Sequence, residues 1–183
     1  DMVVVAPITL QSGAKLQMQR CRLEGDGDVM VIKAGARADF LQVQGRGVIR
    51  VNGADSRPTS LVVRDTQWKG YEGAGVIMVQ GQLDAQGLDL EGAGVSADGG
   101  KLDIRASAIR AAVKDALKLS GSVYAQVEDV TISGCQEVGL HVQGNARLEA
   151  IRCSFSDGGK NDLWVYENGS AVLKDCDLRG GGA

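Results

Sequence analysis

The sequence predicts an all-β solenoid, a single-stranded right-handed parallel β-helix of about eight coils of about 22 residues. Two observations predict it: a segment that recurs at a fixed interval, and short stretches of alternating apolar residues in each repeat. The recurrence is clearest over 140–181, where eight positions return 23 residues later. They are Leu140, His141, Val142, Asn145, Leu148, Cys153, Phe155 and Gly158, followed by Leu163, Trp164, Val165, Asn168, Ala171, Cys176, Leu178 and Gly181. Such a period is typical of stacked repeats.

The first predicted strand of each coil follows a template in which an anchor residue is followed by further residues five and seven positions later. The step of two between the last two positions is strand periodicity, with alternate side chains facing inward. The intervals between anchors are 20, 25, 22, 19, 23, 23 and 23 residues. The template matches Leu16/Cys21/Leu23, Ala36/Leu41/Val43, Leu61/Thr66/Trp68, Leu83/Leu88/Leu90, Leu102/Ser107/Ile109, Ala125/Val130/Ile132, Leu148/Cys153/Phe155 and Ala171/Cys176/Leu178.

A second alternating strand is predicted upstream of most anchors, and polar or Gly-rich turns join the two, because Gly supplies the positive φ of a sharp corner. The segment 52–60 interrupts the pattern, accounts for the interval of 25 residues and predicts a protruding loop. Each strand pairs with its counterpart in the next coil, so the sheets are parallel, and parallel connections are strongly right-handed. The upstream pairs are Ile8/Leu10, Ile49/Val51, Ile77/Val79, Leu117/Leu119, Leu140/Val142 and Leu163/Val165.

Length and composition limit the number of domains and the kinds of partner. The 183 residues fit one domain, 1–183, and the chain opens at Asp1 and stops partway through a coil, so we expect a domain excised from a longer protein. The net charge of −3 is spread without a basic block, which argues against nucleic acid as a partner. No apolar run approaches the roughly 18 to 20 residues that cross a bilayer, so we expect no membrane insertion. The sequence indicates no compartment.

Cofactors and metals are not expected. None of the four cysteines forms a C-x-x-C pair and the chain has one His, which argues against zinc. Carboxylates in the turns could take a hard cation, but no EF-hand or nonapeptide calcium pattern continues them. Cys21, Cys153 and Cys176 share one inward template position and are predicted to be buried, reduced thiols.

The stretches 130–135, 138–142 and 151–155 resemble the parallel β-helix repeats of the pectin-lyase-like superfamily. That resemblance implies the fold, but the superfamily includes polysaccharide lyases, hydrolases and epimerases as well as non-catalytic modules, so it implies no single activity. The polygalacturonase motifs Asn-Thr-Asp, Asp-Asp, Gly-His-Gly and Arg-Ile-Lys are absent from this sequence, as is the Asp-Pro-His-Glu type of motif of the alginate epimerases.

The candidate site is the outward face of the upstream strand. If the upstream pairs point inward, one file of side chains points outward, and aromatic and Arg side chains dominate recognition surfaces. The alternative is an ordinary solvated face, because single exposed apolar residues are common. The file comprises Arg50, Met78, Lys118, His141 and Trp164.

These observations predict a non-catalytic β-helix scaffold that presents this lateral surface to a protein or polysaccharide partner. The alternative is a polysaccharide-active enzyme or carbohydrate-binding domain, a lyase, hydrolase or epimerase, with carboxylate and Arg groups on a strand face doing the chemistry. A third possibility is self-association through the coil ends, because unpaired strand edges invite pairing.

Overall fold

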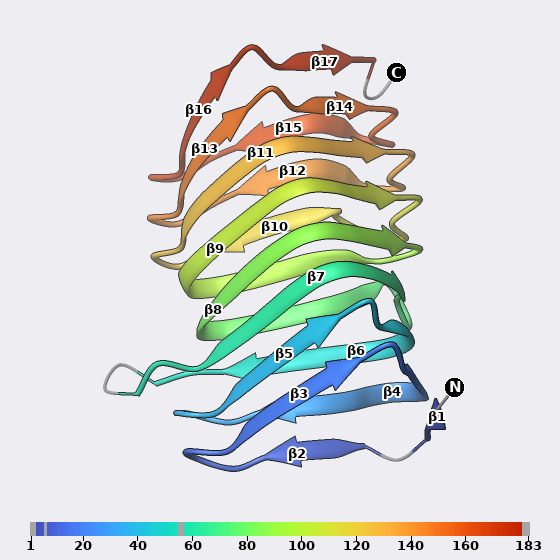
Figure 1. Ribbon diagram of the computed structural model, residues 1–183. Helices are drawn as coiled ribbons and strands as arrows, with labels where there is room; N and C mark the ends of the chain where they lie inside the picture. Colours follow the sequence, from blue (N-terminus) through green and yellow to red (C-terminus); the bar gives the residue numbers. More distant parts are fainter. Residues whose placement is uncertain (1–2, 6, 55–56, 181–183) are drawn as a thin grey trace.

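The computed structural model describes residues 3–5, 7–54 and 57–180, and over these the chain is a parallel β-solenoid. The strands stack in one column, with β1 (Val3–Val4) and β17 (Asp177–Arg179) at opposite ends (Figure 1). Every ladder between named strands is parallel, with each strand paired to its counterpart one turn along the chain. The predicted all-β fold is therefore confirmed.

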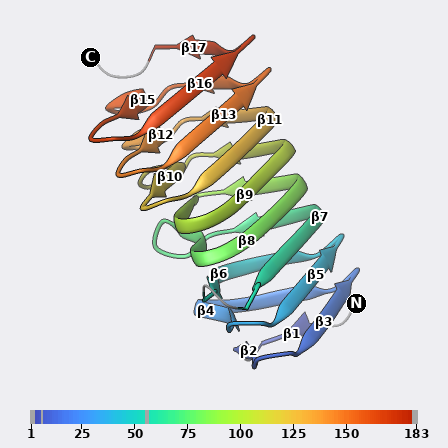
Figure 2. The same cartoon turned by 90° about the vertical axis from the view of Figure 1, so that its left-hand side faces the viewer.

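Each turn runs over three faces. Figure 2 shows the column turned by 90° about the vertical axis, and in this view the successive turns are stacked obliquely. Face A contains β3 (Lys15–Gln19), β5 (Arg37–Leu41), the start of β7 (Ser60–Lys69), the middle of β8 (Ala74–Glu91) and of β9 (Gly94–Arg110), the start of β11 (Tyr124–Ser133), β13 (Arg147–Ile151) and β16 (Ser170–Lys174).

Faces B and C complete the triangle. Face B contains β1, the starts of β4 (Arg22–Ile32) and β6 (Gln44–Asn52), the ends of β7, β8, β9 and β11, β14 (Ser154–Ser156) and β17. Face C contains β2 (Ile8–Leu10), the ends of β4 and β6, the starts of β8 and β9, β10 (Leu117–Ser120), β12 (Val138–Val142) and β15 (Asn161–Val165).

We call each level of the stack a rung and number the rungs by their strands on face A, from rung one at β3 to rung eight at β16. Eight rungs enclose about seven complete turns of about 23 residues, close to the predicted eight coils of about 22. A single hydrophobic core fills the prism between the three faces.

One coil of the template is wrong. Ala38, not Ala36, lies between Leu16 and Leu61 on face A. The second triplet is therefore Ala38/Val43/Gly45, and Leu41 is exposed. The intervals from Leu16 to Ala38 and from Ala38 to Leu61 are 22 and 23 residues, so the irregular intervals of 20 and 25 disappear. The prediction that segment 52–60 accounts for a longer interval is therefore wrong.

The inward position of Gly45 was not predicted, because the template recognises inward positions by their side chains and glycine has none. The Trp68 side chain fills that space from the next rung, and a Cβ at Gly45 would lie 2.1 Å from the Trp68 ring. The indole N–H donates to the Gly47 carbonyl at 2.9 Å, so the buried ring has its hydrogen-bond partner. The missing side chain in rung two therefore makes room for the largest one in rung three.

The corner between faces A and B is a column of left-handed residues, one per rung. Their φ angles lie between 45° and 68°, a region in which each non-Gly residue costs about 1–2 kcal/mol. The next residue can offset part of that cost: Thr66 Oγ1 and Ser107 Oγ each donate to the carbonyl two residues back. The column is Arg20, Gln42, Asp65, Gly87, Ala106, Asp129, Arg152 and Asp175.

The predicted loop 52–60 lies between β6 and β7, and its residues 55–56 fall outside the described residues. The returning limb packs on the earlier rungs: Arg57 Nη1 donates to Ser12 Oγ at 3.0 Å, and buried Thr59 Oγ1 accepts from the Gly35 N–H at 2.9 Å. Nowhere in the described part of the chain is there a helix long and apolar enough to span a membrane.

Candidate binding surface on face C

Register partners on face C form one outward file along the column. Four of the five predicted site residues belong to it, each directly beside the next file member in the ladder. From rung one to rung eight the file reads Thr9, Val31, Arg50, Ile77, Ser96, Lys118, His141 and Trp164.

Met78 does not belong to this file, and its predicted outward position is wrong. It pairs with Val51, points inward and is only 1% exposed, whereas Ile77 takes the outward position beside Arg50. The run Val76-Ile77-Met78-Val79 is apolar throughout, so it carries no alternation from which to read a face. An irregularity between Ala74 and Val76 sets the register that the structure adopts.

His141 points outward but is covered, with only 5% of the residue exposed. Its Nδ1 lies 2.7 Å from Asp115 Oδ2, and Asp115 Oδ1 accepts from the Val138 N–H at 3.2 Å. Asp115 therefore fixes the orientation of the imidazole. The opposite nitrogen, Nε2, is buried without a hydrogen-bond partner among the described residues.

Trp164 and Tyr166 cover the imidazole. The rings of His141 and Trp164 stack with centroids 5.1 Å apart and planes at 20°. Tyr166 lies 5.4 Å from His141 and 5.0 Å from Trp164, and its hydroxyl donates to the Gln143 side chain. Trp164 is 45% exposed, so the indole is the accessible member of this aromatic cluster. Tyr166 could not be predicted from the strand pattern, because it lies past the end of β15 and outside the alternation.

A shallow depression of about 200 Å³ adjoins the cluster on the side of the lower rungs. Two lysines, Lys114 and Lys118, line it together with three acidic residues, Glu72, Asp115 and Glu137. Neither lysine forms an ion pair within the described part of the chain, whereas Arg50, farther along the file, has its Nε 2.6 Å from Asp28 Oδ2. Two lysines that form no ion pair among the described residues, neighbouring carboxylates and an exposed aromatic surface thus meet at rungs six to eight. We name this region, formed by Lys114, Lys118, His141, Trp164 and Tyr166, the face C patch.

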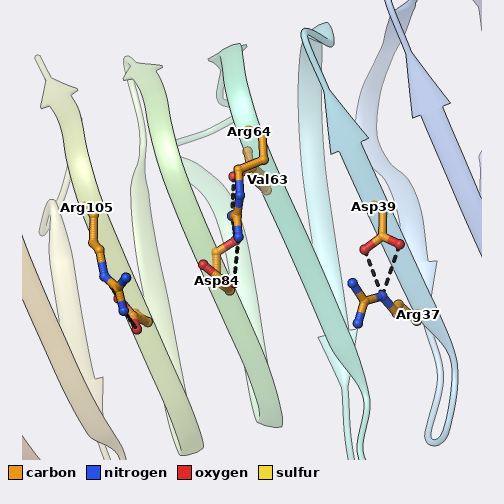
Figure 3. Close-up of polar contacts among 7 residues, drawn as sticks. Arg37, Asp39, Val63, Arg64, Asp84 and Arg105 are labelled. Carbon is orange, nitrogen blue, oxygen red and sulfur yellow. Dashed lines mark hydrogen bonds and ion pairs between the residues drawn. The ribbon is translucent and has the colours of Figure 1, made fainter.

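On face A several arginines pair with neighbouring carboxylates, whereas Lys15, Lys101 and Arg147 on the same face form no ion pair among the described residues. Arg37 Nε lies 2.8 Å from Asp39 Oδ1, and Arg64 Nη2 lies 2.7 Å from Asp84 Oδ2 (Figure 3). Arg64 also donates to the Val63 carbonyl, and Arg105 pairs with Asp103. Each of these three carboxylates is paired with an arginine.

The corner between faces A and B carries a further charge pair. Arg152 donates from Nε and Nη2 to the two oxygens of Asp129 at 2.8 and 2.9 Å. Hydrogen bonding from Arg152 lowers the pKa of Asp129, and hydrogen bonding from Lys174 lowers that of Glu149. A catalytic acid needs the opposite, a carboxyl group kept protonated by a raised pKa.

The predicted carboxylates of the turns are largely paired too. Glu24 lies beside Arg22, Asp26 beside Arg46, and Glu91 beside Lys69. In the described ranges, no group of three or more His, Cys, Asp or Glu side chains is placed to hold a metal ion.

The cysteines are free thiols, as the sequence predicted. Cys21, Cys135 and Cys153 are buried, and Cys176 is partly buried. Burial raises the pKa of the Cys135 thiol to about 11 and also raises that of Cys153, which makes both poor nucleophiles at neutral pH.

Comparison with known proteins gives one match. No curated protein and no solved structure matches the chain. The family model described as a right handed beta helix region matches residues 84–183, more than half of the chain, which agrees with the parallel ladders of rungs four to eight and with the predicted handedness. The fold is one that serves as a scaffold or binding module in general. The chain belongs to the right-handed beta helix family.

Proposed function

We propose that this β-helix is a rigid, non-catalytic module that binds a protein or polysaccharide partner on its lateral surface, through the face C patch. The observation that carries the proposal is the aromatic cluster beside two unpaired lysines. Trp164 presents a large apolar ring to solvent, while His141, which is itself oriented by Asp115, stacks against the ring from beneath. A preorganised aromatic side chain loses little entropy on binding, which is why such residues dominate binding energy at interfaces.

The arrangement of charges supports binding over catalysis. An enzyme of the lyase or hydrolase type needs a carboxylate or an Arg poised toward its substrate. On face A the Arg and Asp side chains are engaged with each other. The depression beside the aromatic cluster combines two lysines with Glu72, Asp115 and Glu137, a mixed set of charges that suits hydrogen bonding to a polar protein or polysaccharide surface.

Trp164→Ala tests the proposal. We expect the thermal unfolding temperature to change by no more than a degree or two, because the indole covers only outer-face residues. Val172→Ala is the matched control, since Val172 is an exposed residue of the same rung on face A. Both variants and the parent chain are run in affinity electrophoresis gels containing polygalacturonate, alginate or dextran. The same proteins are immobilised and challenged with candidate protein partners.

Tryptophan fluorescence gives an independent readout, because Trp68 is buried and Trp164 is the exposed indole. Acrylamide should quench the parent chain and the Val172 variant, and a bound ligand should protect them. Retardation or capture that is lost only in Trp164→Ala supports the proposal. A ligand that binds Trp164→Ala as tightly as the parent contradicts it. Release of unsaturated products or new reducing ends from any of the polysaccharides would favour the enzyme.

A further inference from the structure

Two cysteines occupy the same inward position on neighbouring rungs. Cys153 begins face B of rung seven and Cys176 begins face B of rung eight, in each case directly after the left-handed corner residue. Their ladder neighbours are in register on both sides, Ile151 with Lys174 and Ser154 with Asp177. The Asp177 N–H donates to the Cys153 carbonyl at 2.9 Å, so the two backbones are directly hydrogen-bonded at this point.

This register sets the distance between the two residues. Neighbouring strands lie about 4.8 Å apart, which falls inside the range of about 4.4–6.8 Å between the Cα atoms of disulfide-linked cysteines. Each thiol lies between a carbonyl of its own rung and one of the preceding rung: Cys153 Sγ is 3.2 Å from the Ile151 carbonyl and 3.6 Å from that of Val127. Cys176 Sγ is 3.3 Å from the Lys174 carbonyl and 3.5 Å from that of Ala150. Cys176 therefore already points at rung seven. A rotation of Cys153 about χ1 would turn its sulfur toward rung eight.

The two thiols differ in access. Cys153 is buried, whereas Cys176 is partly exposed on the last described rung, which has a strand neighbour on one side only among the described strands. Cys21 holds the same column position in rung one, and no other cysteine lies in the rungs near it. The pairing is therefore specific to rungs seven and eight.

We propose that Cys153 and Cys176 form an oxidisable pair that closes to a disulfide between rungs seven and eight. With a small-molecule disulfide such as oxidised glutathione as oxidant, the Cys176 thiolate attacks one sulfur. A mixed disulfide forms and one glutathione thiolate leaves. The Cys153 thiolate then attacks the Cys176 sulfur and expels the second glutathione. Two protein thiols are oxidised, one glutathione disulfide is reduced to two thiols, and two protons pass from the cysteines to the glutathione.

The bridge would fix the rung that carries Trp164. Rung eight exposes inward-facing side chains such as Val165 and Leu178, so fewer contacts hold it than hold rung seven. A covalent link to rung seven supplies what those contacts do not. Oxidation would then stabilise rung eight against local opening while leaving the outer surface of face C unchanged.

Intact mass spectrometry tests the pair. The folded chain with Cys21→Ser and Cys135→Ala is incubated with excess oxidised glutathione at about pH 8.5 and blocked with N-ethylmaleimide. We expect a loss of two hydrogens and no maleimide adduct. Trypsin cleaves after Arg152, Lys160, Lys174 and Arg179, so the linked peptides are 153–160 and 175–179. Reduction should separate them and return the starting mass.

The matched control is Cys153→Ser in the same background, which should stop at one glutathione adduct on Cys176. A parent chain that also stops at a single glutathione adduct, or that reacts only after unfolding in urea, overturns the proposal. So does a bridge found only in covalent dimers on non-reducing gels. The oxidised monomer should also show slower hydrogen exchange in β16 and β17, and equal exchange in both forms would contradict the proposed stabilisation of rung eight.

Discussion

Rungs seven and eight have nearly the same sequence pattern and different environments. Phe155 is 0% exposed, whereas Leu178, its register partner one rung on, is 46% exposed. Val142 is fully buried and Val165 beside it is 37% exposed. In a stacked repeat each inward side chain is covered by the rung on either side of it, and rung eight has one such neighbour among the described strands. Position in the stack, not the local pattern, therefore decides how much an inward residue contributes to stability.

The largest expected effect compares the two equivalent positions directly. Phe155→Ala should lower the free energy of unfolding by about 3–5 kcal/mol, because it leaves a cavity in a filled core. Leu178→Ala should cost about 1 kcal/mol or less, since much of that side chain already contacts water. Urea unfolding followed by circular dichroism measures both. Equal losses would mean that rung eight is as well packed as rung seven.

A middle-sized effect extends the comparison to rungs two and three. Gly45→Ala should destabilise by about 1–3 kcal/mol, because the new methyl group collides with the Trp68 ring. In a Trp68→Leu background the same change should cost much less, since a smaller side chain leaves room for the methyl group. The double-mutant cycle isolates this coupling. If the losses in unfolding free energy from the two substitutions simply add, the proposed packing of Trp68 into the space left by Gly45 is contradicted.

The smallest expected effect lies at the corner of rungs six and seven. Arg152→Gln removes the group that lowers the pKa of Asp129, so the stabilisation from this pair is present at neutral pH and disappears as the pH falls below the ordinary aspartate value of 3.8. The unfolding temperature of the variant should fall slightly below that of the parent at pH 7 and match it near pH 2. The Asp129 carboxyl carbon, followed by NMR, should titrate at higher pH in the variant.

Much of the fold could be predicted from sequence. In rungs four to eight, inward residues such as Leu83, Leu148 and Phe155 alternate with polar ones, and parallel stacking requires a nearly constant period. The Cys153 and Cys176 positions followed from the same template. In each case an apolar or small residue lies between polar neighbours, so the pattern indicates which side chain faces the core.

The predicted strand register was wrong where inward and outward residues did not differ in polarity. Met78 lies in an apolar run in which either alternation is possible, and Gly45 leaves its inward position unmarked because its partner fills the space from another rung. Four members of the file on face C were predicted, Arg50, Lys118, His141 and Trp164, but the cover over His141 was not. It depends on Tyr166 and on Asp115, which lies 26 residues before His141 in the chain and reaches it only through the fold.

The position directly after the left-handed corner residue of each rung tolerates chemically different side chains. Thr66, Ser107, Cys153 and Cys176 each donate to the carbonyl two residues earlier, through oxygen in two rungs and sulfur in two. The corner therefore accepts any short side chain with one donor proton, and a protein designer could exchange serine, threonine and cysteine there without altering the backbone. Because the redox pair needs cysteines at this position on two neighbouring rungs, exchanging sulfur for oxygen in one of them would remove the redox sensitivity.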